Sequence, residues 1–314
     1  MKKNYLNVFM ILFLSTNMSL FAELIPLPLS VEVDDKKAQL GKKLFLDPIL
    51  SKDKTLSCIS CHKLLDNGAD NVAYTEGIDG KIGLFNAPTV YNAVYNFRQF
   101  WDGRAKNLKE QALKPIENPV EMGNTVEQAI KDLKADEAYR RMFNEIFKDG
   151  ITTNNLAKVL AEFEKTLITP NSAFDKYLRG DEKALNAQEQ KGYQLFTTKG
   201  CISCHNGINI GGNLYNKFGI YKDAESKELG RYNQTKKEED KYVFKVPSLR
   251  NVAITAPYMH DGRVDTLEDA VNIMTKYQLG RPMNKEDLKN IVAFLKTLTG
   301  ELPDIVKDID DKDK

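Results

Sequence analysis

Apolar side chains recur at helical spacing along most of this chain, and the alternation typical of β-strands is scarce. The segment 156–167 carries apolar residues three and four positions apart. Thr125-Val-Glu-Gln128 has the spacing of a helix-capping box, and Asn284 predicts the start of another helix that ends near Gly300. We therefore predict an all-α protein.

Four sequence landmarks occur twice in the same order, which indicates an internal duplication. They are Gly-x-x-Leu-Phe from 41 and 192, Cys-x-x-Cys-His from 58 and 201, Pro-x-x-x-Asn from 88 and 247, and Asp-Gly-Arg from 102 and 261. The offset is 159 residues for the last two landmarks and 143 for the cysteine motifs, so the second unit carries a longer insertion between them. Such a repeat predicts two similar tandem domains.

We place the junction between the domains in the segment 170–180. The expected division is a first domain at 23–169, a second domain at 170–302 and a charged tail at 303–314. The tail carries enough charge that we expect it to be loose.

All four cysteines fall within the two Cys-x-x-Cys-His motifs, which comprise Cys58, Cys61 and His62 in the first unit and Cys201, Cys204 and His205 in the second. In this motif two thiols form thioethers to a haem, and the adjoining imidazole ligates the iron. Two disulfides, or one zinc site with four thiolates, would not require a histidine after each second cysteine. A thioredoxin-like redox pair would need a βαβ pattern, which is missing here. We predict two covalently bound haem c groups.

The amino terminus predicts export. Lys2 and Lys3 precede an apolar run at 8–14 that is too short to span a bilayer, and Phe21-Ala22-Glu23 offers a cleavage point. We expect 1–22 to be a cleaved signal peptide, with a retained anchor as the alternative. Because covalent haem attachment takes place outside the bacterial cytoplasm, we expect a periplasmic protein without a stable membrane anchor.

Charge gives no indication of a polyanionic partner. Removal of the predicted signal takes two lysines from the 45 basic residues and leaves all 44 acidic ones, so the formal charge becomes −1. We therefore expect no nucleic-acid binding. The remaining chain is long enough for two domains, each with its own core.

The two units differ after the Asp-Gly-Arg landmark. In the second unit, the thioether of Met274 is able to ligate the iron and raise its reduction potential, although a lone methionine is more often a packing residue. In the first unit, Gln111 precedes a proline-rich loop with Glu117 and Glu121. A carboxylate there is able to move a proton between the oxygens of bound peroxide, and an amide is able to stabilise the developing charge. The chemistry alone does not decide whether Glu117 or Glu121 has this role. For both residues the alternative is an ordinary solvated carboxylate.

Together these features resemble the bacterial dihaem cytochrome c peroxidases, a family related to the MauG enzymes. Besides both haem motifs, the resemblance is carried by Asn-Ala-Pro-Thr from 86, Phe-Trp-Asp-Gly-Arg from 100, Glu-Met-Gly from 121, Thr-Ala-Pro-Tyr-Met-His-Asp-Gly-Arg from 255 and Gln-Leu-Gly from 278. It covers nearly the whole mature chain. It implies two tandem cytochrome c-like domains, each with one haem.

The resemblance also implies ligands for the two irons. His62 would be the proximal ligand of a low-potential peroxidatic haem in the first domain. His205 and Met274 would ligate a high-potential electron-transfer haem in the second. Electrons would then enter at the second haem.

Three further residues gain roles from the resemblance. Glu121 and Gln111 would form the acid–base pair over the open face of the first haem, which selects Glu121 over its neighbour. Trp101 would lie between the haems and shorten the electron path, with ordinary packing as the alternative.

A calcium site at the domain interface is implied as well, formed by Asn86 and the backbone carbonyls of Thr255 and Pro257. Amide and carbonyl oxygens suit this hard cation. The resemblance further implies a homodimer.

One feature departs from the family pattern. Many relatives have a histidine in the loop before the Asn-Ala-Pro-Thr motif that occupies the peroxidatic iron until the enzyme is reduced. Here the loop 74–83 has no histidine, and the third histidine of the chain, His260, lies in the second unit. We expect His260 to hydrogen-bond in the haem pocket or to be purely structural. We hypothesise that the first iron is open without prior reduction, unless Met122, Tyr74 or Lys81 replaces the histidine.

The expected reaction is reduction of hydrogen peroxide to water, with electrons from a small periplasmic cytochrome c or copper protein. One alternative is a MauG-like oxidase acting on a partner protein, which would use a tyrosine such as Tyr277 in place of the methionine ligand. The other is a dihaem electron carrier, which would have two six-coordinate irons and no use for an acid–base pair.

Overall fold

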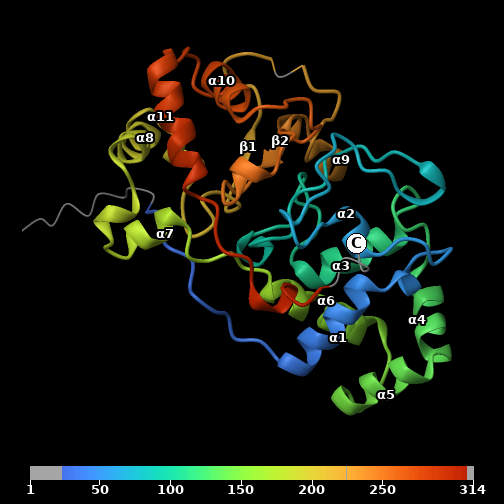
Figure 1. The fold of residues 1–314 in the computed structure, drawn as a ribbon. Coiled ribbons are helices and arrows are strands. Elements are labelled where there is room, and N and C mark those ends of the chain that lie inside the picture. Colours follow the sequence, from blue (N-terminus) through green and yellow to red (C-terminus); the bar gives the residue numbers. More distant parts are fainter. Residues whose placement is uncertain (1–22, 224, 310–314) are drawn as a thin grey trace, which may run out of the picture.

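The computed structural model describes residues 23–223 and 225–309, so the predicted signal peptide lies outside the described residues. Within these ranges the chain forms eleven α-helices and one antiparallel sheet of two short strands. The helices fall into two groups, α1 to α6 and α7 to α11, and the sheet belongs to the second group (Figure 1). The all-α prediction is confirmed.

The first unit contains α1 (Asp35–Leu46), α2 (Cys58–Cys61), α3 (Leu108–Glu117), α4 (Val126–Ala135), α5 (Glu137–Ile146) and α6 (Thr153–Thr166). The predicted cap is present, because the Thr125 side chain accepts a hydrogen bond from the Gln128 amide. The apolar stretch at 156–167 lies on α6, whose apolar face is buried. Both helix predictions in this unit are confirmed.

The second unit contains α7 (Ala173–Leu178), α8 (Ala187–Thr198), β1 (Tyr215–Lys217), α9 (Tyr232–Thr235), β2 (Val243–Lys245), α10 (Leu267–Tyr277) and α11 (Lys285–Lys296). Asn284 caps α11 as predicted, by accepting from the Asp287 amide. The helix ends earlier than predicted, at Lys296 rather than near Gly300. The Leu298 carbonyl accepts from the Asn251 amide in a neighbouring loop, so the backbone leaves the helix there.

The glycines of the first landmark occupy equivalent places in the two units. Gly41 on α1 packs so closely on α6 that a Cβ atom would lie 2.0 Å from the Val159 carbonyl oxygen. Gly192 on α8 approaches α11 in the same way, and its Cβ would lie 1.9 Å from the Asn290 carbonyl oxygen. Any side chain would separate these helix pairs. The sequence repeat therefore corresponds to a repeated helix pair.

The asparagines of the third landmark meet at the boundary between the units. Asn92 and Asn251 share a left-handed backbone conformation, each with φ of 61°. Their side-chain amides both donate to the hydroxyl oxygen of Thr169, over 2.8 Å and 2.9 Å. One threonine thus joins corresponding loops of the two units.

Both ends of the described chain cross to the opposite unit (Figure 1). At the amino-terminal end, Leu24 joins the apolar core of the second unit, whereas the division predicted from the sequence places it in the first. At the other end, Val306 and Ile309 are buried in the core of the first unit beside Phe45 and Phe163. The expectation of a loose tail is therefore wrong for 304–309, because its apolar residues face inward while its charges remain exposed.

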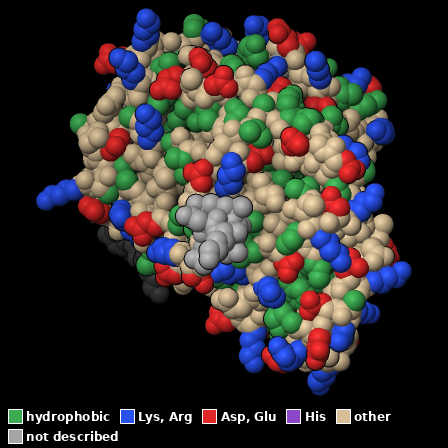
Figure 2. Space-filling model, turned by 45° about the vertical axis from the view of Figure 1, so that its right-hand side comes forward, with side chains coloured by type: hydrophobic (Ala, Val, Ile, Leu, Met, Phe, Trp, Pro, Cys, Tyr) green, Lys and Arg blue, Asp and Glu red, His purple; other side chains and the backbone are tan. Residues whose placement is uncertain are grey.

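The outer surface agrees with the near-neutral charge. Figure 2 shows Lys and Arg side chains interspersed with Asp and Glu over the face in view. Among the residues that the structure describes, no helix is long and apolar enough to cross a membrane.

A buried ion pair fastens the amino-terminal segment to the second unit. The Arg250 guanidinium lies 3.0 Å from the Asp175 carboxylate, and both side chains are almost fully buried. Arg250 also donates to the Ile25 carbonyl, and Asp175 accepts from the Leu27 amide. The pair is therefore hydrogen-bonded on both sides.

We predict that Asp175→Asn lowers the free energy of unfolding by about 3–5 kcal/mol, because it leaves the Arg250 charge buried without compensation. Urea unfolding followed by circular dichroism measures the loss. The control is Glu301→Gln, which breaks the exposed pair with Lys176 and should cost no more than about 1 kcal/mol. Equal costs for the two variants would contradict the prediction.

A second buried group, the Glu164 carboxyl, is expected to make the stability of the fold depend on pH. Burial raises the pKa of Glu164 on α6 to about 8 from an ordinary value of 4.5, and one carboxyl oxygen has no hydrogen-bond partner among the described residues. Between these pH values the unfolded chain releases the proton while the folded protein retains it. The stability contributed by the protonated group is therefore lost as pH rises from 4.5 to 8.

We predict that Glu164→Gln removes this loss, since the amide stays neutral throughout. Wild type and variant should have similar free energies of unfolding near pH 4.5, and the variant should be the more stable at pH 9. Urea titrations at several pH values test this. Parallel pH profiles for the two proteins would show that Glu164 does not titrate as expected.

Candidate functional site

The first Cys-x-x-Cys-His motif presents a neutral imidazole. Helix α2 carries Cys58 and Cys61, and the amide of His62 donates to the Cys58 carbonyl. His62 Nδ1 lies 3.1 Å from the Gly68 carbonyl oxygen, which fixes the proton on Nδ1 and leaves the Nε2 lone pair available. Burial lowers the pKa of His62. This tautomer is the one that ligates an iron.

The second motif presents a similar imidazole. Cys201 begins a 3₁₀ turn and accepts from the His205 amide. Burial lowers the pKa of His205 to about 4, against the opposing effect of the Ile210 and Pro247 carbonyls nearby. His205 Nδ1 is buried without a partner in hydrogen-bonding geometry among the described residues. His205 is therefore also neutral and able to ligate.

The thiols are neither paired nor gathered into one cluster. All four cysteines are free, and the two pairs adjoin separate apolar cores. Burial raises the pKa of Cys61 to about 12 and that of Cys201 to about 11, so both thiols are protonated. Within the described ranges no three His, Cys, Asp or Glu side chains are grouped to hold a metal ion. The alternatives of two disulfides or one four-cysteine zinc site do not fit this arrangement.

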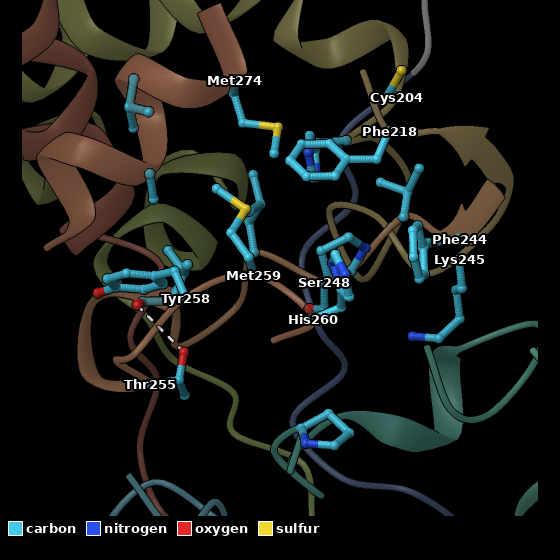
Figure 3. Close-up of a pocket in the computed structure, with 18 of the residues that line it drawn as sticks. Cys204, Phe218, Phe244, Lys245, Ser248, Thr255, Tyr258, Met259, His260 and Met274 are labelled. Carbon is cyan, nitrogen blue, oxygen red and sulfur yellow. Dashed lines mark hydrogen bonds between the residues drawn. The ribbon is translucent and has the colours of Figure 1, made fainter. Parts of the chain in front are cut away.

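A large cavity adjoins the second motif (Figure 3). It encloses ≈ 1820 Å³ of empty space, including its open mouth, and Cys201, Cys204 and His205 line it. Most of the other lining side chains are apolar. Two thiols, a neutral imidazole and thioethers thus border one apolar space of sufficient size, so the residues fit a haem with covalent attachment.

Two methionines from different segments reach this cavity. Met274 comes from α10, where the sequence predicted an iron ligand, and Met259 comes from the loop before α10 (Figure 3). The role of Met274 as a ligand stays a prediction. Met259 was not predicted to line a haem cavity, although it stands in the Thr-Ala-Pro-Tyr-Met-His-Asp-Gly-Arg motif from 255, which was a usable signal.

A run of hydrogen bonds crosses the boundary between the units at the edge of this cavity. The Trp101 indole donates to the Asn86 carbonyl over 2.9 Å, and the Trp101 carbonyl accepts from the Lys245 amide over 2.8 Å. The backbone amide of Asn86 donates to the His260 carbonyl over 2.9 Å. Trp101 lies in the same apolar cluster as Met274. The structure therefore places Trp101 beside the cavity at the second motif, and the part of Trp101 in electron transfer stays a prediction.

His260 is packed among aromatic rings. Its ring stacks on Phe244 with centroids 4.3 Å apart and meets Trp101 edge-on at 6.3 Å. Its Nε2 lies 2.7 Å from the Ser226 hydroxyl, and burial lowers its pKa. His260 thus lines the cavity as a neutral, hydrogen-bonded ring, which agrees with a structural role.

Glu121 lies beside the first motif and is partly buried. Burial raises the pKa of its carboxyl, against the opposing effects of a hydrogen bond from Asn118 and the charge of Arg104. The Asn118 amide donates to Glu121 over 2.5 Å. The Glu121 charge in turn raises the pKa of the Cys61 thiol. The carboxyl is therefore near the expected attachment point of the first haem.

The neighbouring acid has a different environment. Glu117 is 47% exposed and lies 3.9 Å from the Lys114 ammonium, as a solvated surface residue does. Gln111 lies one turn before Pro115 on α3, and the loop with Glu121 folds back so that the Met122 amide donates to the Pro115 carbonyl. No hydrogen bond joins Gln111 to Glu121 in the part of the chain described. The acid–base pair stays a prediction.

The three residues of the expected calcium site border the same cavity. Asn86 comes from the first unit, and Thr255 and Pro257 come from the second. The Asn86 side-chain NH₂ donates to the Val72 carbonyl over 2.8 Å, which leaves its amide oxygen as the candidate ligand. All three residues line the cavity at the boundary, and the calcium site stays a prediction.

The three side chains considered as substitutes for the missing histidine all have other environments. Met122 is buried in the helical core of the first unit. Tyr74 is 43% exposed, and the Lys81 ammonium contacts the Pro119 carbonyl at the surface. This arrangement agrees with an open first iron.

Comparisons with known proteins agree with the two-unit organisation. The family model described as di-haem cytochrome c peroxidase matches residues 35–183, and the cytochrome c model matches residues 189–299. Each matched range contains one Cys-x-x-Cys-His motif.

Individual relatives cover most of the chain. Cytochrome c551 peroxidase of Nitrosomonas europaea is 50% identical over 270 residues, which are 85% of this chain and 81% of that protein. Methylamine utilization protein MauG of Methylorubrum extorquens is 31% identical over 298 residues, 89% of this chain and 82% of that protein. The crystal structure of a MauG-like protein associated with microbial copper homeostasis covers 91% of this chain and 95% of its own, with 26% identity and a TM-score of 0.76. The chain therefore belongs to the di-haem cytochrome c peroxidase family.

Proposed function

We propose that this protein is a periplasmic peroxidase that reduces hydrogen peroxide to two waters. Two electrons come from a small cytochrome c or copper protein, and two protons complete the balance. The relative from N. europaea, at 50% identity, is named as a peroxidase and supports this reaction. Export by a cleaved signal peptide accounts for the periplasmic location.

The observation that carries the proposal is a difference between the two motifs. Beside the first, Glu121 is a carboxyl with a raised pKa. The cavity at the second is bordered by Met274 and Met259 and, among the described residues, by no carboxylate. A carboxyl thus lies beside the first motif, whereas the described lining of the cavity at the second motif has candidate sulfur ligands and no carboxyl.

The residues of the first unit handle the protons. When bound, the haem supplies the redox centre at which the oxygen–oxygen bond of peroxide is broken. Glu121 accepts the proton from the near oxygen and returns it to the far oxygen, which leaves as water. Burial raises the pKa of this carboxyl, which makes it a stronger proton acceptor than an exposed glutamate. Gln111 hydrogen-bonds the oxygen that gains charge, and His62 would hold the iron of the first haem.

The residues of the second unit handle the electrons. His205 and Met274 would hold the iron of the second haem, which would supply electron transfer when bound. Trp101, bonded to both units, provides a rigid aromatic contact on the path between the haems. Calcium held by Asn86, Thr255 and Pro257 would stiffen this boundary, and the active protein is a homodimer.

Two other functions fit the residues less well. A MauG-like oxidase would place a tyrosine at the second iron, but Met274 lines the cavity and Tyr277 is not among its lining residues. A pure electron carrier has no use for a desolvated Glu121. Peroxide turnover with reduced cytochrome c separates the peroxidase, which is fast, from both alternatives.

We predict that Glu121→Gln lowers kcat/KM for peroxide by about 10²–10⁴-fold, the usual contribution of a general acid–base. Both haems should remain attached, because the substitution leaves both cysteine motifs intact. The control is Glu117→Gln, which changes an exposed acid close by in the chain and should keep kcat/KM within about twofold. Comparable losses in the two variants would remove Glu121 from the mechanism.

We also predict that the ferric protein as isolated contains one high-spin and one low-spin haem, since no histidine is available for the sixth position of the first iron. Electron paramagnetic resonance and absorption spectra distinguish the two spin states. A wholly low-spin ferric protein that reacts with peroxide only after one-electron reduction would refute the open first iron.

A further inference from the structure

One buried cation in the second unit has no role in the function proposed above. Lys245 ends β2, is only 7% exposed and lines the cavity at the second motif. Its ammonium has no hydrogen bond or ion pair within the described residues. Burial lowers its pKa to about 8, and no neighbouring charge opposes this. The lysine is therefore an unpaired cation at the wall of an apolar cavity.

The surroundings offer no counter-ion. Among the described residues that line the cavity there is no Asp or Glu, and Lys245 is the one Lys or Arg. Its position is fixed, because its amide donates to the Trp101 carbonyl and β2 pairs Lys245 with Tyr215. A buried ammonium without a partner costs several kcal/mol. An anionic group that reaches this wall of the cavity would compensate for that charge.

A haem carries its acids on the edge opposite the one joined to the cysteines. Thioether bonds to Cys201 and Cys204 would hold the vinyl edge at their side of the cavity, and the two propionates would point away from it. Figure 3 shows Cys204 at the top of the group of side chains and the nitrogen of Lys245 well below it, beyond Phe244. The lysine therefore lies on the side where propionate is expected.

We propose that Lys245 binds a propionate of the haem at the second motif and serves as its counter-ion. This inference rests on the proposed occupation of the cavity by haem. A cation that neutralises a propionate favours the ferrous over the ferric iron, because the ferric iron carries one more positive charge. Lys245 therefore raises the reduction potential of the second haem. Because the backbone amide of Lys245 donates to the Trp101 carbonyl, the lysine also links the propionate edge of the haem to Trp101.

The test is a spectropotentiometric titration of the purified dihaem protein, which resolves the two haems and uses no peroxide. Lys245→Met keeps the apolar stem and removes the charge. We expect the equilibrium constant for reduction of the second haem to fall about tenfold, which is ~59 mV for a one-electron couple. Lys245→Arg keeps the charge and should stay close to wild type.

Lys217→Met is the matched control, since Lys217 is an exposed lysine on the partner strand β1, and it should leave both potentials unchanged. If Lys245→Met loses the second haem while Lys245→Arg and Lys217→Met retain it, the propionate contact is also supported. An unchanged potential in a fully loaded Lys245→Met protein, or a shift confined to the first haem, overturns the inference.

Failure of this inference is distinct from failure of the proposed function. A wild-type protein that contains two haems but does not turn over peroxide would defeat the peroxidase proposal, and the titration of Lys245→Met would still be decisive. Full peroxide turnover in wild type combined with an unchanged potential in Lys245→Met would defeat only the role of Lys245.

Discussion

Hydrogen bonds across the boundary between the two units hold the two haem motifs in a fixed relation, and the proposed chemistry depends on that relation. The Thr169 hydroxyl accepts from Asn92 and Asn251, one from each unit. Trp101 is bonded through its indole to the first unit and through its carbonyl to the second. Electron transfer between haems requires short, constant distances, and these bonds supply the rigidity.

Burial then gives the two motifs different chemistry on the same scaffold. Both imidazoles are neutral because they are desolvated, so both are able to ligate iron. What differs is the surrounding charge. The first motif has a partly buried carboxyl, whereas the second has sulfur and a buried ammonium in an apolar cavity. In this protein the two units share a similar helix pair and differ in the side chains around the motifs and in the insertion and sheet of the second unit.

Local signals in the sequence predicted much of this structure. The helix caps at Thr125 and Asn284 and the repeated helix pair followed from short patterns, because caps and close helix contacts depend on one or two residues. The crossing of the chain ends did not, since it depends on distant contacts of Leu24 and Val306. The buried state of Lys245 was also unpredictable, because a strand lysine is usually exposed and only the cavity shows otherwise.

In the proposed function, one haem reacts with peroxide while the other stores an electron. The most direct measurement mixes half-reduced protein with one equivalent of peroxide and follows each haem by rapid-freeze electron paramagnetic resonance. We expect the haem of the second unit, for which Met274 is the proposed ligand, to lose its electron as peroxide is consumed at the first haem. Two six-coordinate haems whose spectra do not change on mixing would contradict it.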